Sequence, residues 1–156
     1  MRVAADHWFD GERFRREPVL VEVHGERIER LTPLAVGAAP ASGAVDARGR
    51  LLLPGLIDAH AHIARAGFFE ADEPPLQVAQ IVRNFQGALR AGVTTVADMG
   101  CTMPMLSALR RLTDDDPLAG PRFLGAGPVV TATEGYPFTW ISPLWRHAEA
   151  AIAVDD

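Results

Sequence analysis

Short apolar runs rich in β-branched residues alternate with turn residues over the first fifty positions. The runs at residues 19–23 and 28–31 flank His24-Gly25-Glu26, a pattern typical of a β-hairpin. Residues 35–43 are rich in Ala, Gly and Pro, and they predict a loop that leads into another short strand near residue 45. This part of the chain therefore predicts a small layer of β-strands.

From residue 51 the pattern changes to strands that alternate with helices. Residues 51–63 are apolar and strand-like, residues 76–91 have helical periodicity, and residues 92–100 are typical of a β-branched strand. A second, shorter helix follows, and a third strand is expected at residues 122–124. The helix-spaced apolar positions are Val78, Val82, Phe85 and Leu89, and then Met105, Leu109 and Leu112. Successive strand–helix units predict an α/β fold with a parallel sheet covered by helices.

The length limits how much of such a fold the chain can form. A closed (β/α)₈ barrel needs roughly 250 residues, and the part after residue 51 can supply about three of the eight units. Residues 125–137 predict an irregular loop, and residues 146–154 predict a further helix. We therefore expect an open portion of a barrel, whose bare strand edges and apolar helix faces need a cover.

The composition narrows the possible functions. The chain has 156 residues, 48% of them hydrophobic, and a net charge of -5, so it offers no basic surface to nucleic acid or to an anionic membrane. No apolar run approaches the roughly 20 residues that span a bilayer, and residues 1–14 lack the apolar core of a signal peptide. A single cysteine, Cys101, agrees with a reducing compartment. These features together favour a cytoplasmic protein.

Alternation along residues 56–63 separates a polar face from an apolar face. The polar face carries Leu56, Asp58, His60 and His62, and the apolar face carries Ile57, Ala59, Ala61 and Ile63. Because the apolar face suits packing against helices, the histidines are expected to point toward the barrel axis, near the strand end where barrel active sites form. Two imidazoles at this spacing can bind one metal ion.

An isolated His-x-His pair is also common as the polar side of a half-exposed strand. Three features favour the metal-site interpretation here. A Pro-Gly bend precedes the strand, the carboxylate of Asp58 would be costly to bury without hydrogen bonds, and the strand opens a strand–helix series.

The segment LPGLIDAHAH at residues 53–62 resembles the signature of the amidohydrolase superfamily. Residues 89–100 and 120–128 resemble the second and third barrel segments of the branch that contains imidazolonepropionases and Xaa-Pro dipeptidases, or prolidases. The resemblance implies the N-terminal part of a metal-dependent hydrolase TIM barrel with a flanking small β-sandwich. Residues 1–52 would belong to the sandwich, and residues 53–156 would form the first three or so units of a barrel that is incomplete in this chain.

The resemblance also implies a site and an activity. It assigns metal ligation to His60 and His62, and it makes Asp58 a buried supporting residue. The family's other ligands, a lysine or its substitute and further histidines, and its general-base aspartate are expected outside this chain. All fifteen basic residues are arginine, so no carboxylated lysine can form here. The implied reaction is hydrolysis of a C–N bond in an amide, cyclic amide or amidine, without a covalent intermediate, by water activated on one or two divalent ions, with Zn²⁺ expected.

The expected substrate is a small molecule or a short peptide, and we expect the isolated chain to be inactive. Activity would require a complementing polypeptide with the rest of the barrel, or further copies of this chain. The alternative is a truncated or noncatalytic interaction subunit that keeps the fold without turnover.

Two further groups are candidates for supporting the site. Asp98, at the end of the second predicted strand, could orient a ligand or a loop through hydrogen bonds, or could cap a turn. Aromatic residues crowd the loops after the first and third strands, where they could line a substrate pocket, pack within the loops or contact a partner. The pocket candidates are Phe68, Phe69, Tyr136 and Trp140.

Overall fold

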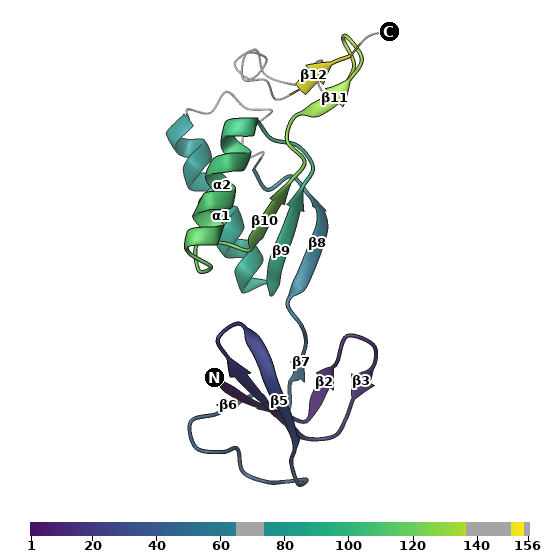
Figure 1. Ribbon diagram of the computed structural model, residues 1–156, viewed down its shortest axis with the longest axis vertical. Helices are drawn as coiled ribbons and strands as arrows, with labels where there is room; N and C mark the ends of the chain where they lie inside the picture. The colour runs from purple at the N-terminus through teal and green to yellow at the C-terminus, as the bar shows by residue number, and fades with distance from the viewer. Residues whose placement is uncertain (65–73, 137–150, 155–156) are drawn as a thin grey trace. The chain divides into compact units, whose positions relative to one another are not determined.

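A computed structural model of the protein describes residues 1–64, 74–136 and 151–154 (Figure 1). The chain divides into two compact units, Met1–Pro54 and Gly55–Asp156. The first unit consists of short strands, and the second unit contains both helices. Each unit has its own apolar core.

The first unit contains two small sheets. The larger sheet has the order β5-β4-β1-β6, and the smaller has the order β3-β2-β7. The strands are β1 (Arg2–Ala5), β2 (His7–Phe9), β3 (Phe14–Arg15), β4 (Val19–His24), β5 (Arg27–Pro33), β6 (Val45–Asp46) and β7 (Leu51–Leu52). The predicted hairpin is confirmed, because β4 and β5 pair antiparallel across a turn in which Gly25 has a φ of 56°.

The two sheets of this unit share one apolar cluster. Ala5, Val19 and Val21 of the larger sheet are buried, and Trp8 and Leu52 of the smaller sheet pack against them. The indole N–H of Trp8 also donates a hydrogen bond of 3.0 Å to the carbonyl of Glu17. The bulky indole therefore contributes apolar area to the cluster while its polar edge is paired.

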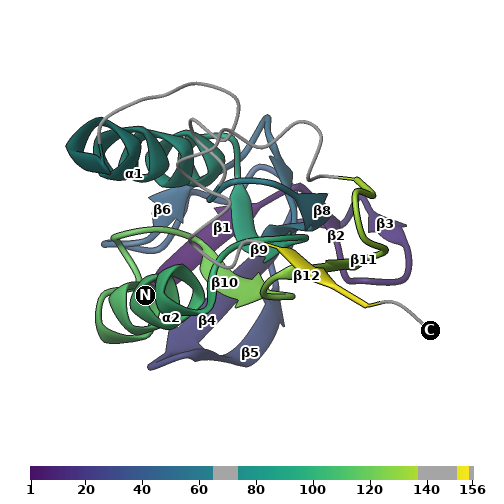
Figure 2. The same ribbon diagram turned by 90° about the horizontal axis from the view of Figure 1, so that it is seen from above.

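The second unit begins with a parallel sheet of order β10-β9-β8, and both helices lie on one face of it (Figures 1 and 2). The elements are β8 (Leu56–Ala61), α1 (Pro74–Arg90), β9 (Val93–Asp98), α2 (Met103–Asp115), β10 (Arg122–Gly125), β11 (Val129–Thr131) and β12 (Ala151–Ala153). The core cluster contains Ile81 and Phe85 of α1, Leu106 and Leu109 of α2, and Val96 of β9. This arrangement confirms the predicted α/β class and the predicted series of strands and helices.

Both helices form as predicted. The residues that each helix buries, however, differ in part from the apolar positions that were predicted to face the sheet. In α1, Ile81 and Phe85 are buried, whereas Val78 is 57% exposed and Val82 is 43% exposed. In α2, Leu112 is 40% exposed, and the buried stripe runs through Leu106, Leu109 and Thr113. Each helix carries more apolar residues than one sheet-facing stripe can bury, so periodicity alone left the orientation open.

The end of the chain differs from its prediction. Residues 151–153 form β12, which pairs in parallel with β11, whereas the sequence predicted a helix over residues 146–154. Residues 146–150 of that prediction lie outside the described residues. The strand β11 itself lies within the stretch 125–137 that was predicted as an irregular loop. Pairing between segments distant in the sequence overrides the weak helical preference of a short Ala-Ile-Ala run.

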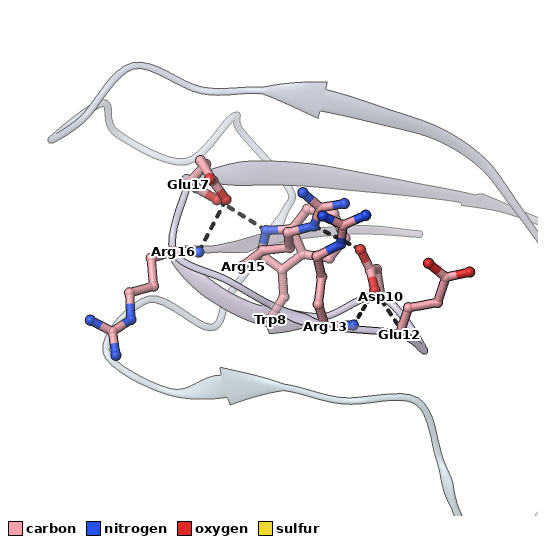
Figure 3. A network of polar contacts seen from close by, with 7 residues as sticks. All are labelled: Trp8, Asp10, Glu12, Arg13, Arg15, Arg16 and Glu17. Carbon is pink, nitrogen blue, oxygen red and sulfur yellow. Dashed lines mark hydrogen bonds and ion pairs between the residues drawn. The ribbon is translucent and has the colours of Figure 1, made fainter.

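Figure 3 shows a polar network in the β2–β3 hairpin of the first unit. One carboxylate oxygen of Asp10 accepts the backbone N–H groups of Glu12 (2.9 Å) and Arg13 (2.8 Å), and the other accepts the Nε–H of Arg15 at 2.7 Å. The guanidinium carbon of Arg15 lies 6.0 Å from the centre of the Trp8 ring. The hydrogen bonds from Arg13, Glu12 and then Arg15 lower the pKa of Asp10 well below its ordinary value of 3.8.

The packing of Gly120 gives a test of the second core. A Cβ at this position would overlap the ring of Phe85, which is 0% exposed and has no room to move. We expect Gly120→Ala to lower the free energy of unfolding by about 1–3 kcal/mol through overpacking. Unfolding in denaturant measures this change in the free energy of unfolding. Gly87→Ala is the matched control, because a Cβ there meets nothing within 4 Å, and alanine should stabilise α1 by about 0.5–1 kcal/mol. Equal effects of the two changes would contradict this account.

The Asp10 turn predicts a pH dependence. Because folding lowers the pKa of Asp10, its carboxylate stabilises the folded state fully above the unfolded value of 3.8, and this contribution is lost as the pH falls below that value. The stability difference between the natural protein and Asp10→Asn should therefore shrink on acidification from neutral pH toward pH values below 3.8. Thermal unfolding at several pH values checks this. Glu12→Gln serves as the control, since Glu12 contributes its backbone N–H to the turn. A difference that stays constant with pH would contradict the assignment.

Candidate metal centre

His60 of β8 and His62, the first residue after the strand, lie next to each other. Ala61 and Ile63 pack against the core cluster that includes residues of both helices, whereas His60 and His62, which alternate with them along the chain, are not part of that cluster. Both histidines are exposed. Their ring centroids are 5.6 Å apart, and the ring planes make an angle of 87°. The structure thus brings together the two residues that the sequence predicted as metal ligands.

The spacing of the rings fits two donors of one metal ion. Two imidazoles bound to a tetrahedral ion, with metal–nitrogen distances of about 2.0–2.1 Å, have ring centroids about 5 Å apart. The observed separation of 5.6 Å is close to this value. Within residues 1–64, 74–136 and 151–154, no group of three or more His, Cys, Asp or Glu side chains is placed to hold an ion. Among the described residues, the two histidines are therefore a candidate pair of donors, fewer than the three protein ligands that a catalytic zinc ion normally has.

His60 lies in a bulge of β8 that no local sequence pattern predicts. The register of the β8–β9 pairing shifts between Asp58 and Ala61, because three steps along β8 match two steps along β9. Within this irregular stretch, the side chain of Asp58 accepts the backbone N–H of His60 at 3.1 Å. Such bulges re-aim side chains and are frequent beside functional sites.

Asp58 is exposed, so the prediction of a buried supporting residue is wrong for this structure. The physical reason is local, since the side chain accepts a backbone N–H within the irregular stretch of β8 that lies outside the core cluster. The predicted apolar face is also covered only in part, because Ile57 is 70% exposed and helix packing involves Ala61 and Ile63. Asp58 supports the site through the backbone of His60.

Asp98 lies at the carboxyl end of β9 and is 0% exposed. One carboxylate oxygen accepts the N–H of Ala64 at 2.9 Å, and the other accepts the N–H of Gly100 at 3.0 Å. The first bond holds the chain just after His62, and the second caps the turn after β9. Both roles considered from the sequence, loop orientation and turn capping, are therefore present in one side chain.

Sequence reasoning missed Asn84 of α1. Its side-chain amide donates a hydrogen bond of 3.1 Å to the carbonyl of Ile63, one residue after His62. The available signal was a polar residue that directly precedes Phe85, one of the apolar positions predicted to face the sheet.

The aromatic pocket is not assembled by the described residues, since Tyr136 is 56% exposed, and Phe68, Phe69 and Trp140 lie outside them.

The described part of the second unit is an α/β arrangement, with a parallel sheet, helices on one face of it and two histidines near the carboxyl end of β8. A comparison with known protein families matches residues 51–154 to the amidohydrolase family. The chain belongs to this family, whose members generally bind divalent metal ions. The resemblance seen in residues 53–62 is thereby confirmed.

Solved structures of prolidase type are similar in fold. A prolidase complexed with N-methylphosphonate-L-proline has a TM-score of 0.70 and 23% identity, and the match covers 100% of this chain and 41% of that chain. A Xaa-Pro dipeptidase with bound methionine has a TM-score of 0.66 and 22% identity, and the match covers 91% of this chain and 37% of that chain. The ochratoxinase of A. niger has a TM-score of 0.69 and 18% identity, and the match covers 99% of this chain and 41% of that chain. The chain thus spans about two fifths of these proteins.

The comparison with curated protein sequences gives no match. Neither of the two helices described above has the length and apolar character that a bilayer span requires.

The paired histidines predict metal binding by the chain itself. We expect Zn²⁺ to shift the imidazole resonances of His60 and His62 together in an NMR titration. Replacing either one by Ala should weaken binding by about tenfold or more, because half of the described donor set is lost. His7→Ala is the matched control, since His7 is an exposed histidine of the first unit. An equal loss of affinity in all three variants would contradict a site on β8.

Proposed function

We propose that this chain supplies the first metal-binding strand of a metal-dependent hydrolase that acts on C–N bonds. The observation that carries the proposal is the placement of two exposed imidazole rings, those of His60 and His62, with centroids 5.6 Å apart near the carboxyl end of β8. Membership of the amidohydrolase family supports it. Zn²⁺ is the proposed ion, since two imidazoles suit a borderline divalent metal.

In this proposal, His60 and His62 hold one side of a divalent ion, in a site that holds one or two ions. When bound, such an ion would supply a water molecule whose pKa is lowered to about 7, and it would polarise the substrate's C=O or C=N bond, whose carbon the water would attack. Asp58 holds the backbone of His60, and Asp98 holds the backbone that follows His62. The remaining ligands and the general-base aspartate come from segments other than β8, and the reaction needs no covalent intermediate.

We further propose that turnover requires a second polypeptide with the remaining barrel segments, or further copies of this chain. Two histidines alone leave a divalent ion largely solvated and weakly held. Residues 1–156 contain no lysine, so a carboxylated lysine ligand would have to come from outside these residues. The alternative function is a noncatalytic interaction subunit.

The substrate proposed first is a dipeptide that ends in proline. Fold likeness to a prolidase complexed with N-methylphosphonate-L-proline and to a Xaa-Pro dipeptidase supports this choice. A small amide is the second choice, since the family as a whole consists of amidohydrolases. Both substrates contain an amide group whose carbonyl carbon activated water can attack, after which the C–N bond breaks and the amine leaves.

The function is tested by native mass spectrometry and metal analysis of the chain isolated from its own cells, with hydrolysis of Xaa-Pro dipeptides as the assay. We expect the purified, Zn²⁺-loaded chain to be inactive. An assembly with a lysine-containing partner should carry stoichiometric metal and turn over, and His60→Ala or His62→Ala should lower its kcat/KM by about a hundredfold or more. His7→Ala is the control. Turnover by the single chain would refute the need for a partner, and a single metal-free chain would favour the interaction subunit.

A further inference from the structure

We propose that Asn84 and Asp98 form a two-sided clamp on the peptide group between Ile63 and Ala64 and are positioning residues for the imidazole of His62. The inference rests on the proposed function, in which His62 is a metal ligand. It adds a residue of α1 to the site, and it assigns the buried carboxylate of β9 a specific task.

The clamp holds both polar atoms of one peptide group. The carbonyl of Ile63 accepts the side-chain amide of Asn84 at 3.1 Å, and the N–H of Ala64 donates to the carboxylate of Asp98 at 2.9 Å. These two atoms belong to the same planar unit and point in opposite directions. A peptide group bound on both sides is unable to rotate without breaking at least one hydrogen bond.

Both arms of the clamp are themselves fixed. The second oxygen of Asp98 accepts the N–H of Gly100 at 3.0 Å, and the side-chain oxygen of Asn84 accepts the amide of Gln80 at 2.9 Å. Asp98 is 0% exposed and Ala64 is 5% exposed. Hydrogen bonds that involve a carboxylate in such a water-poor setting are stronger than those at the surface.

The position of the clamp along the chain explains why His62 needs it. The strand β8 ends at Ala61, whose carbonyl accepts the N–H of Met99 at 2.8 Å. His62 is therefore the first residue beyond the strand, held by the ladder on one side and by the clamp on the other. A metal ligand must be held within about 0.5 Å of its productive position, so loss of the clamp should loosen the imidazole.

The clamp is tested on the full chain with Asn84→Leu and Asp98→Asn. The matched control is Gln86→Leu, because Gln86 lies on the same helix and its amide donates to the carbonyls of Leu118 and Ala119. In the metal-free chain, we expect amide exchange of Ala64 to be about tenfold faster in both clamp variants, with increased motion of the His62 ring in NMR relaxation. In a titration with Zn²⁺, the affinity should fall by about 10–100-fold. The control should show none of these effects.

The clamp and the proposed function fail in different ways. If Zn²⁺ does not shift the imidazole resonances of His60 and His62 in the natural chain, the proposed function fails. The amide exchange of Ala64 and the motion of the His62 ring in the metal-free chain still decide whether the clamp exists. If both quantities are the same in Asn84→Leu and Gln86→Leu, the clamp is overturned. Asn84→Leu is decisive should the buried change Asp98→Asn prevent folding, since Asn84 is only half-buried.

Discussion

Burial of the Asp98 carboxyl group is the constraint on which the site end of the second unit depends. A buried carboxylate is costly unless its oxygens accept hydrogen bonds, and here the donors are the N–H groups of Ala64 and Gly100. These donors lie in the segments that follow β8 and β9. The burial cost is offset only when both segments adopt the observed arrangement, so a single side chain couples the ends of two neighbouring strands.

The backbone around Asp98 extends this coupling to the third strand. The carbonyl of Asp98 accepts the N–H of Ala126, just after β10, and the N–H of Cys101 donates to the carbonyl of Gly127. The carboxyl ends of β8, β9 and β10 are thus joined to one another by hydrogen bonds. Ligands and substrates of strand–helix barrels bind at this end, so its rigidity bears directly on the proposed chemistry.

The histidine pair combines order and exposure. Its backbone is fixed by the bulge at Asp58 on one side and by the bonds to Ala61 and Ala64 on the other, while the rings themselves are exposed. A fixed backbone with accessible rings suits a ligand pair that is completed by further donors. The same exposure makes a two-donor site weak by itself, which is why the proposal assigns turnover to a larger assembly.

Local patterns sufficed for much of this fold. The β4–β5 hairpin, both helices, the three parallel strands and the histidine pair follow from periodicity, turn residues and a short motif. Other features depend on partners distant in the sequence. Examples are the orientation of α1 about its axis, the strand β12 that replaced a predicted helix, and the exposure of Asp58.

By itself, the sequence identified His60 and His62 as a candidate metal-binding pair, because residues two apart in an extended segment share a face. The tertiary structure decided how that face is held. The bulge before Ala61, the contact of Asn84 with Ile63 and the double use of Asp98 each require two segments to meet in space. Such long-range contacts depend on packing and on the pairing of buried polar groups across the whole unit, so local residue preferences do not predict them.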